Sequence, residues 1–252
     1  MCFERADWDQ NGVCVFAPVP EVTAWVAAAR PLAQAELDAR REQPGQMRHG
    51  GTWFVGLDAL PNAADGSVAG VALQGPWQDM VPTPATWHPA QVSGVFPGYP
   101  GRDAGDTDAG FRYRRDRGAA HLDGLLAEGP AKRRFLREPH GFILGLPLDG
   151  CRAAPLLVWP GSHQIMGDAL RGAIGACDPG AVDLTDAYVA ARREVFDTIA
   201  PVPVRADPGG AILLHRHLLH GIDIWRDAEA GGAKQRLIAY FRPLFPRLTD
   251  WL

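Results

Sequence analysis

The segment DPGGAILLHRHLLHGI, residues 207–222, contains the clearest succession of turns and strands in the chain. Asp207-Pro-Gly-Gly210 is a strong turn signal, and the apolar run of residues 211–214 that follows it has the length of a buried strand. If the chain turns again at residues 216–219, His220 opens the next strand and faces inward. A strand, a short turn and a returning strand are typical of an antiparallel sheet.

Candidate strands recur on both sides of this segment. They comprise residues 111–115, 142–148, 155–159, 202–205 and 236–242, and shorter runs broken by Gly and Pro fill residues 52–99. With Gly 29 and Pro 22 in 252 residues, the composition favours many turns over a helical bundle. The strands therefore predict an antiparallel β core.

Helices are expected to pack on this core. Residues 23–41 are rich in Ala, Leu and Arg, with Pro31 interrupting the helix, and residues 130–138 are expected to form a short helix that begins at Pro130. Ser162 can cap a helix with Met166, Leu170 and Ile174 on one stripe. Asp183 can cap another, whose buried side is expected to carry Leu184, Tyr188, Phe196 and Ile199. Because no linker divides the chain, residues 1–252 are expected to form a single domain.

Composition excludes several classes of protein. The net charge of −4 and the pI near 6.0 give no overall positive field for nucleic acid. The longest uncharged stretch, residues 80–101, is interrupted by prolines and cannot be a membrane span, and the first residues are too acidic for a signal peptide. Cys2, Cys14, Cys151 and Cys177 lack CxxC spacing, which indicates reduced thiols and a cytoplasmic location.

The pair His121-x-Asp123 is the sharpest chemical signal. On a strand, residues i and i+2 project to one face, so an imidazole and a carboxylate would converge there. A second, distant histidine would complete the two-His, one-carboxylate set that leaves three positions of an octahedral iron open. By itself, however, an HxD motif is most often a pair of solvated loop residues.

A second cluster contains His215, His217 and His220. Three histidines within six residues could form a zinc site, but the HExxH pattern is absent. On a straight strand His215 and His217 would share a face that excludes His220. We interpret His215 and His217 as turn-capping residues and retain His220 as the candidate ligand.

Taken together, four segments resemble the phytanoyl-CoA dioxygenase family. They are HLDGLL (121–126), PLLVWPGSHQ (155–164), LLHRHLLHG (213–221) and QRLIAYFRP (235–243). The resemblance runs from about residue 91 to residue 243, with its elements in the family's order. It implies an oxygenase dependent on Fe(II) and 2-oxoglutarate, built on a double-stranded β-helix (jelly-roll, cupin-like) core with flanking helices.

Residue by residue, the resemblance places iron on His121, Asp123 and His220, which are also the expected catalytic residues. It places the distal carboxylate of 2-oxoglutarate on Arg236. Residues 227–234 lengthen the interval between His220 and Arg236 beyond the family's usual spacing, so Arg226 is a rival for the anchor. The Asn or Ser that often follows the distal histidine is replaced here by Gly221. Gln91, on a predicted strand, is a further candidate for cosubstrate contact.

The expected reaction is oxidation by O₂, with hydroxylation of a small or medium organic molecule and release of succinate and CO₂. Two alternatives stay open: a cupin-like metal-dependent isomerase or hydrolase, and an inactive jelly-roll binding module. Arg115 and Arg117 are interpreted as surface residues, His163 as structural or pocket-lining, and Trp159 and Trp225 as core or pocket wall. The sequence reveals neither the prime substrate nor the oligomeric state.

Overall fold

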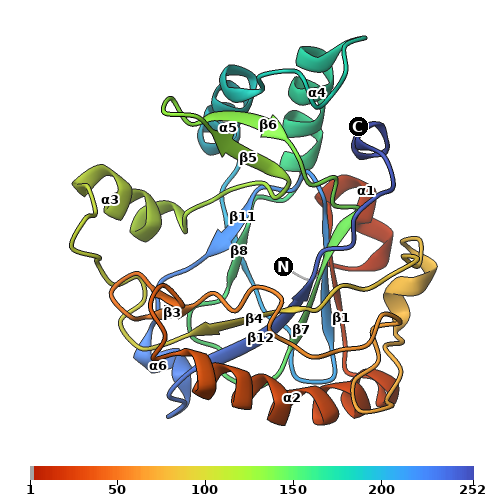
Figure 1. The fold of residues 1–252 in the computed structure, drawn as a ribbon, viewed down its shortest axis with the longest axis vertical. Coiled ribbons are helices and arrows are strands. Elements are labelled where there is room, and N and C mark those ends of the chain that lie inside the picture. The colour runs from red at the N-terminus through yellow and green to blue at the C-terminus, as the bar shows by residue number, and fades with distance from the viewer. Residues whose placement is uncertain (1–2) are drawn as a thin grey trace.

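The computed structural model describes residues 3–252, and its centre is a large antiparallel sheet (Figure 1). This sheet runs in the order β1 (Val13–Phe16), β10 (Ala211–His215), β7 (Phe142–Pro147), β12 (Arg236–Phe241), β4 (Gln91–Val95), β3 (Trp53–Phe54) and β2 (Met47–Arg48). A smaller antiparallel sheet has the order β11 (His220–Ile222), β8 (Leu156–Val158) and β9 (Val202–Val204). Strands β5 (Leu125–Glu128) and β6 (Arg133–Leu136) form a separate hairpin.

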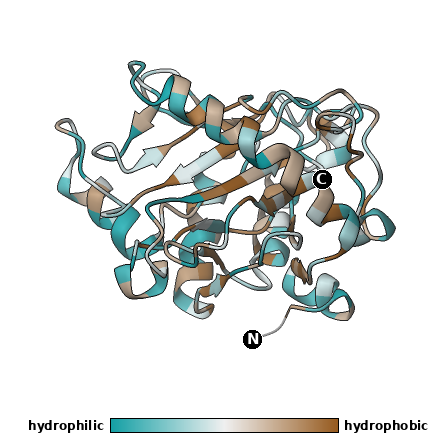
Figure 2. Cartoon of the chain, turned by 90° about the horizontal axis from the view of Figure 1, so that it is seen from below, coloured by the Kyte–Doolittle hydropathy of each residue, from teal (hydrophilic) through white to brown (hydrophobic). Residues whose placement is uncertain are grey.

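Helices surround the sheets. They are α1 (Trp8–Asn11), α2 (Pro20–Arg40), α3 (Asp108–Arg117), α4 (Ser162–Ile174), α5 (Thr185–Thr198) and α6 (Asp227–Ala230), with 3-10 turns at Arg5–Asp7, Pro76–Asp79 and Leu248–Trp251. In Figure 2 the most hydrophobic segments lie in the interior, whereas hydrophilic residues are concentrated in peripheral loops and helices. This arrangement confirms the prediction of a mainly β fold with flanking helices.

Helix α2 covers the outer face of the large sheet (Figure 1). Its fully buried side chains include Trp25, Ala29 and Leu37, which belong to one core cluster with alternate residues of the sheet strands. The expected interruption at Pro31 is wrong, because the helix continues through it. Burial of the apolar stripe on both sides of Pro31 outweighs the hydrogen bond that the proline removes.

The opposite face of the large sheet is turned toward the small sheet. Ile212 and Leu214 of β10 and Ile143 of β7 cluster there with Leu156 and Val158 of β8. Because neighbouring residues of a strand point to opposite faces, β7 and β10 are apolar on both faces. The space between the two sheets is the interior in which the candidate site lies.

Helices α4 and α5 pack on the far side of the small sheet. Met166, Leu170 and Ile174 are buried there, as the predicted stripe requires, together with Tyr188 and Val195 of α5. Ser162 is predicted to cap α4, but the N-cap position is occupied by Gly161 and Ser162 is the first residue of the helix.

Two predicted elements are wrong. Residues 111–115 belong to helix α3 and form no strand, because the Thr107 side chain caps the helix by accepting a hydrogen bond from Gly110 N. Residues 130–138 contain the turn and second strand of the β5–β6 hairpin, which replaces the expected helix. Pairing of Leu125 with Leu136 buries both side chains against α4 and α5, and local helix propensity is overridden.

The short strand β1 is not among the strands that the sequence predicts. It pairs with β10 and closes one edge of the large sheet, with Val13 and Cys14 buried. Within residues 3–252 no helix is both long and apolar enough to cross a membrane. Cys151 and Cys177 are free thiols, and Cys2 lies outside the described residues.

Candidate metal centre

His121 and His220 face each other across an antiparallel bridge. The His121 N–H donates to the His220 carbonyl at 2.8 Å, and the His220 N–H donates back at 3.2 Å. Since paired residues of an antiparallel bridge project to the same side, the rings lie with their centroids 4.7 Å apart. Residues 122–124 are outside any strand, so convergence comes from pairing between distant segments rather than from the expected i, i+2 geometry.

Two glycines allow the backbones to approach so closely. The Ile222 N–H donates to the Gly118 carbonyl at 3.0 Å, and a Cβ atom on Gly221 would lie 2.2 Å from that same oxygen. Gly221 therefore allows β11 to approach residues 118–120. This contact accounts for a glycine directly after His220, where the family pattern has an Asn or Ser.

Asp123 completes the cluster. Its Oδ1 lies 3.4 Å from His121 Nε2, and its Oδ2 lies 3.9 Å from His220 Nε2. One ligand atom from each of the three residues can be chosen so that all lie within 4.8 Å of one another. Gly124 follows with φ +93°, and a Cβ there would lie 2.4 Å from the Glu138 carbonyl oxygen, so the turn after the carboxylate requires glycine.

Backbone carbonyls fix the orientation of both imidazoles. Nδ1 of His121 lies 3.0 Å from the Ala119 oxygen, and Nδ1 of His220 lies 2.9 Å from the Leu218 oxygen. Because a carbonyl oxygen only accepts, each Nδ1 carries the proton, and each Nε2 presents its lone pair toward Asp123 when the ring is neutral. Ligating histidines are commonly held in this way by their second nitrogen.

The loop before His220 is itself held in place. Ser162, which begins α4, accepts a hydrogen bond from the Leu219 N–H at 3.0 Å through its buried hydroxyl. The serine expected to cap α4 therefore supports the loop that presents His220. The PGSH motif thus links the helix to the site through Ser162, and not through the neighbouring His163.

Electrostatics within the cluster favour an ionised carboxylate. Burial alone would raise the pKa of Asp123, but the hydrogen bond from His121 and the charges of His220 and Arg242 hold it well below its usual value. Burial lowers the pKa of His121, yet hydrogen bonding to Asp123 and its charge raise it overall. Burial and the His121 charge lower the pKa of His220 to about 4. At neutral pH the site combines an anionic carboxylate with a neutral His220.

Arg242 is a member of the site that the sequence did not indicate. Its Nη1 lies 3.3 Å from Asp123 Oδ2, and its Nη2 donates to Gln91 Oε1 at 2.7 Å. Gln91 in turn donates to the Val55 carbonyl at 2.7 Å, and its side chain is buried. Gln91 is thus directed into the same space as the triad and is connected to Asp123 through an arginine.

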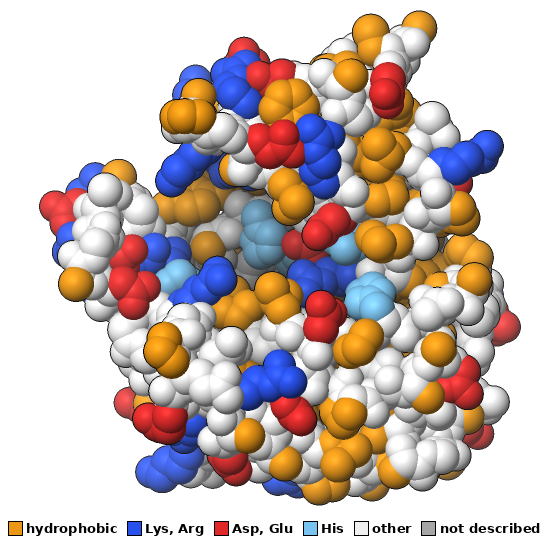
Figure 3. All heavy atoms as spheres, in the orientation of Figure 1, with side chains coloured by type: hydrophobic (Ala, Val, Ile, Leu, Met, Phe, Trp, Pro, Cys, Tyr) orange, Lys and Arg blue, Asp and Glu red, His pale blue; other side chains and the backbone are white. Residues whose placement is uncertain are grey.

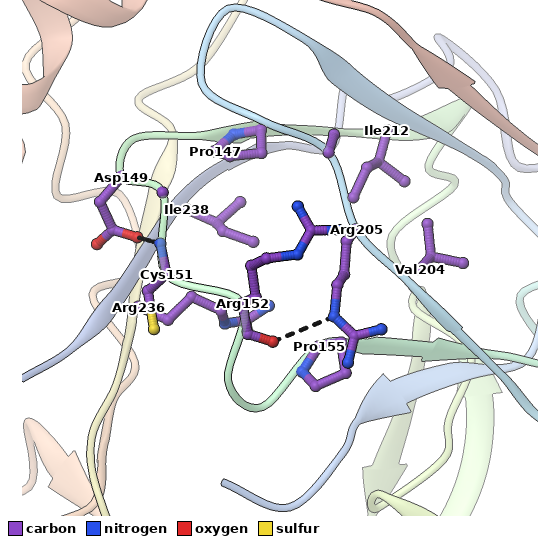
Figure 4. A pocket seen from close by; sticks show the side chains of 12 residues that line it. Pro147, Asp149, Cys151, Arg152, Pro155, Val204, Arg205, Ile212, Arg236 and Ile238 are labelled. Atoms are coloured by element: carbon purple, nitrogen blue, oxygen red, sulfur yellow. Dashed lines mark hydrogen bonds between the residues drawn. The ribbon is translucent and has the colours of Figure 1, made fainter. Parts of the chain in front are cut away.

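The inward face of β12 carries polar groups without partners. Arg236, Ile238 and Tyr240 alternate along this face, and Arg236 is 3% exposed. Among the described residues, Nε and Nη2 of Arg236 and the Tyr240 hydroxyl have no hydrogen-bond partner. Burial raises the pKa of Tyr240, whereas the charge of the nearby Arg236 acts in the opposite direction. Figure 4 shows Arg236 with Ile238 and Pro147 at the wall of a small cavity.

A larger cavity of about 260 Å³ opens at the triad, and Figure 3 shows the hollow with histidine and arginine side chains at its floor. Its inner walls come from β4, β7, β8, β10 and β12. They include Gln91, Ser93, Ile143, Leu156, Leu214 and Tyr240. Its outer walls include Arg48, His49, Trp53, Val55, Leu57, Tyr99 and Ile222.

The other sequence candidates lie elsewhere. Arg226 is directed to Asp223, with hydrogen bonds of 2.6 and 3.3 Å, and it does not line the cavity. Arg115 binds Asp116 at the surface, and Arg117 lies over the Phe196 ring.

His163, His215 and His217 form a separate group of rings and are not part of the triad. Neighbouring ring centroids lie 4.8 and 5.3 Å apart, with interplanar angles of 50° and 68°. Trp159 and Trp225 are buried in core clusters.

Comparisons with known proteins support the fold. No protein-family model matches the sequence, and no curated protein matches it. The structure is similar to SnoK, a non-heme alpha-ketoglutarate (2-oxoglutarate) dependent carbocyclase from nogalamycin biosynthesis, with a TM-score of 0.53, 12% identity, and coverage of 97% of this chain and 86% of SnoK. Two further matches are EctD from S. alaskensis with bound Fe (TM-score 0.45, 15% identity, 96% and 78% coverage) and AviO1 from Streptomyces viridochromogenes Tue57 (0.42, 14%, 98% and 99%).

At this level of identity the likeness to SnoK concerns the fold. It confirms the predicted jelly-roll core, in which the large and small antiparallel sheets face each other. Fold alone does not imply function, so the chemistry has to be argued from the residues of the site.

Proposed function

We propose that residues 1–252 form a single oxygenase domain that depends on Fe(II) and 2-oxoglutarate and oxidises a small or medium organic molecule. The observation that carries the proposal is the convergence of His121, Asp123 and His220 at the wall of a cavity inside a jelly-roll core. Two imidazoles and one carboxylate on one side of a metal ion are the ligand set of non-haem Fe(II) oxygenases.

The donor set fits this metal on its own geometry. Both Nδ1 atoms are hydrogen-bonded to carbonyls, so each Nε2 faces Asp123 and offers its lone pair to a metal when the ring is neutral. The carboxylate is anionic, and Gly221 and Gly124 set the backbone around it. When bound, Fe(II) with 2-oxoglutarate and O₂ supplies the oxidising power that removes a substrate hydrogen, and succinate and CO₂ are the coproducts.

Arg236 is the proposed anchor for the distal carboxylate of 2-oxoglutarate. A buried guanidinium with unpartnered Nε and Nη2 is costly unless an anion pairs with it, and its planar fork matches a carboxylate. The Tyr240 hydroxyl, which also lacks a partner, faces the cavity on the same strand face and can donate to the same carboxylate. Gln91 is expected to contact the cosubstrate near the metal. Arg226 is the weaker candidate, because Asp223 already occupies its guanidinium.

The jelly roll contributes orientation and exclusion of water. Ile143, Leu156 and Leu214 line the cavity and belong to one buried apolar cluster, against which Tyr240 packs. A low-dielectric wall of this kind strengthens the pairing between Arg236 and a carboxylate. We favour the oxygenase over a metal-dependent isomerase or hydrolase because 2-oxoglutarate has a distal carboxylate that this buried cation can bind.

Binding and turnover test the proposal together. Purified protein is freed of metal, supplied anaerobically with Fe(II), and titrated with 2-oxoglutarate while the visible charge-transfer absorption is recorded. The proposal predicts one equivalent of each bound, no absorption in Asp123→Ala, and succinate formation after O₂ is admitted. Metal binding without any 2-oxoglutarate affinity would favour the isomerase or hydrolase, and absence of metal binding would favour the binding module.

A further inference from the structure

We propose that the substrate is an organic anion with a flat, apolar body, and that Arg48 binds its charged group at the outer end of the cavity. This inference rests on the proposed function, since it assigns the inner end to 2-oxoglutarate. It names the chemical class of the substrate, which neither the sequence motifs nor the comparisons provide. The observations that carry it are the row of residues containing Arg48, its lack of a partner, and the aromatic wall beside it.

Arg48 and Arg236 stand at opposite ends of one row across the large sheet. Arg236 pairs with Val95, Val95 pairs with Trp53, and Trp53 pairs with Arg48. Directly paired residues project to the same face, so the row places Trp53 and Arg48 on the inner face, beyond Arg236. Three strand spacings of about 4.8 Å separate the two arginine backbones by roughly 14 Å. The five-carbon cosubstrate held at Arg236 leaves Arg48 for a second anion.

Arg48 is a cation without a counter-ion. Among the described residues, Arg48 and Arg242 are the arginines that line the cavity, and Arg242 is paired with Asp123. Within residues 3–252 no salt bridge of Arg48 is found. Asp103 is directed to the same loop, but its carboxylate accepts from the backbone N–H groups of His49 and Gly50.

The wall next to Arg48 is built from rings. His49 stacks on Trp53 with ring centroids 5.3 Å apart and an interplanar angle of 15°. The ring centroid of Tyr99 lies 6.0 Å from that of His49. The indole N–H of Trp53 donates to Ser93 Oγ at 3.0 Å, which holds the ring in place. Burial and the charge of Arg114 lower the pKa of His49, so this ring adds no charge at neutral pH.

The entrance is apolar as well. Leu57 lines the cavity and is 55% exposed, so it presents an apolar side chain at the entrance. Val55 and Ile222 extend the apolar surface toward the triad. A flat hydrocarbon body can lie against this wall with its reactive carbon near the triad, while its anionic group meets Arg48 at the rim.

The test uses wild-type protein loaded anaerobically with Fe(II) and saturated with 2-oxoglutarate. Benzoate, cinnamate and 2-naphthoate are each compared with the corresponding neutral amide by calorimetric titration. At least one acid should bind, and about ten-fold or more tightly than its amide, because only the acid gains a charged hydrogen bond. The preference should vanish in Arg48→Gln and persist in part in Arg48→Lys. Arg193→Gln, which changes an exposed arginine of α5 outside the cavity, should leave it unchanged.

The outcomes separate this inference from the function on which it rests. If wild-type protein binds 2-oxoglutarate but none of the three acids, or binds amides as tightly as acids, the anionic substrate class is wrong. An acid preference that survives in Arg48→Gln would overturn the role of Arg48. Failure of wild-type protein to bind 2-oxoglutarate would instead contradict the proposed function.

Discussion

Asp123 accepts from two directions, and this arrangement defines the site at the level of single residues. His121 Nε2 lies 3.4 Å from Oδ1, whereas His220 Nε2 at 3.9 Å and Arg242 Nη1 at 3.3 Å both lie near Oδ2. The arginine neutralises a carboxylate whose side chain is only 11% exposed. It also connects that carboxylate to Gln91. Arg242 is therefore a positioning residue for the triad.

Replacing Arg242 with Gln should destabilise the metal-free protein by about 1–3 kcal/mol, because a buried carboxylate loses its charged partner. A bound divalent ion supplies positive charge to Asp123, so the deficit should shrink when metal is present. Urea unfolding with and without Zn²⁺ measures both values. As a matched control, Arg152→Gln removes an exposed pair with Asp207 and should change little. An equal loss of stability with and without metal would contradict the role given to Arg242.

The second residue-level prediction concerns Arg236. Arg236→Lys should weaken 2-oxoglutarate binding by roughly 1.5–3 kcal/mol, the value of a charged hydrogen bond, while metal affinity stays nearly unchanged. The measurement is an anaerobic titration of the Fe(II)-loaded variant. Arg226→Lys is the control and should titrate like the wild type. Unchanged affinity in the Arg236 variant, with a loss in the Arg226 variant, would reverse the assignment.

At the level of elements, the strands show what sequence can and cannot predict. Strand β10 and the start of β12 were predictable because turn signals and apolar runs delimit them, and the buried stripe of α4 followed from its spacing. The helix through Pro31 and the hairpin at residues 125–136 were not predictable from the sequence. In both, tertiary packing overrides the local conformational preference.

The candidate site was likewise predictable only in part. The family resemblance named His121, Asp123 and His220, and the structure brings them together. Arg242 lies within the segment QRLIAYFRP, but the resemblance assigns it no role, and Arg48 belongs to no motif. The alternation of side chains along β12 could have indicated Arg242. This arginine lies two residues after Tyr240 and therefore on the same, inward face. Arg48 becomes visible through the pairing of β2, β3 and β4, which short runs broken by Gly and Pro did not reveal.

One element-level prediction follows from the close approach at Gly221. Gly221→Ala places a Cβ 2.2 Å from the Gly118 oxygen, so β11 must move away from residues 118–121. We expect a loss of about 1–3 kcal/mol in unfolding free energy and roughly ten-fold weaker metal binding. Gly172→Ala, in α4 with open space around it, should be neutral or stabilising. Metal affinity equal to wild type in Gly221→Ala would show that this approach does not position His220.

For the whole molecule, buried histidines outside the triad predict sensitivity to acid. Burial, with the charge of His163 and neighbouring arginines, lowers the pKa of His215 to about 3, and burial lowers that of His217 well below its ordinary value. The unfolded chain protonates these groups near pH 6.5, whereas the folded chain does not. Unfolding free energy should therefore fall as pH decreases from about 6.5 toward 3.

Each such histidine contributes a slope approaching about 1.4 kcal/mol per pH unit. Urea midpoints between pH 7.5 and 5.5 measure the slope for wild type and for His215→Asn. The variant should show the flatter dependence, because its folded and unfolded states no longer differ in proton uptake at this position. Parallel curves for the two proteins would show that His215 is not the source.

The central claim concerns the whole molecule as well: one jelly roll holds a metal ion and a dicarboxylate at fixed points of its interior. A crystal structure of protein grown anaerobically with Fe(II) and 2-oxoglutarate tests it most directly. The account predicts iron about 2.0–2.2 Å from His121 Nε2, His220 Nε2 and an Asp123 oxygen, with the distal carboxylate of 2-oxoglutarate on Arg236. Iron bound elsewhere, or a dicarboxylate that leaves Arg236 unpaired, would contradict it.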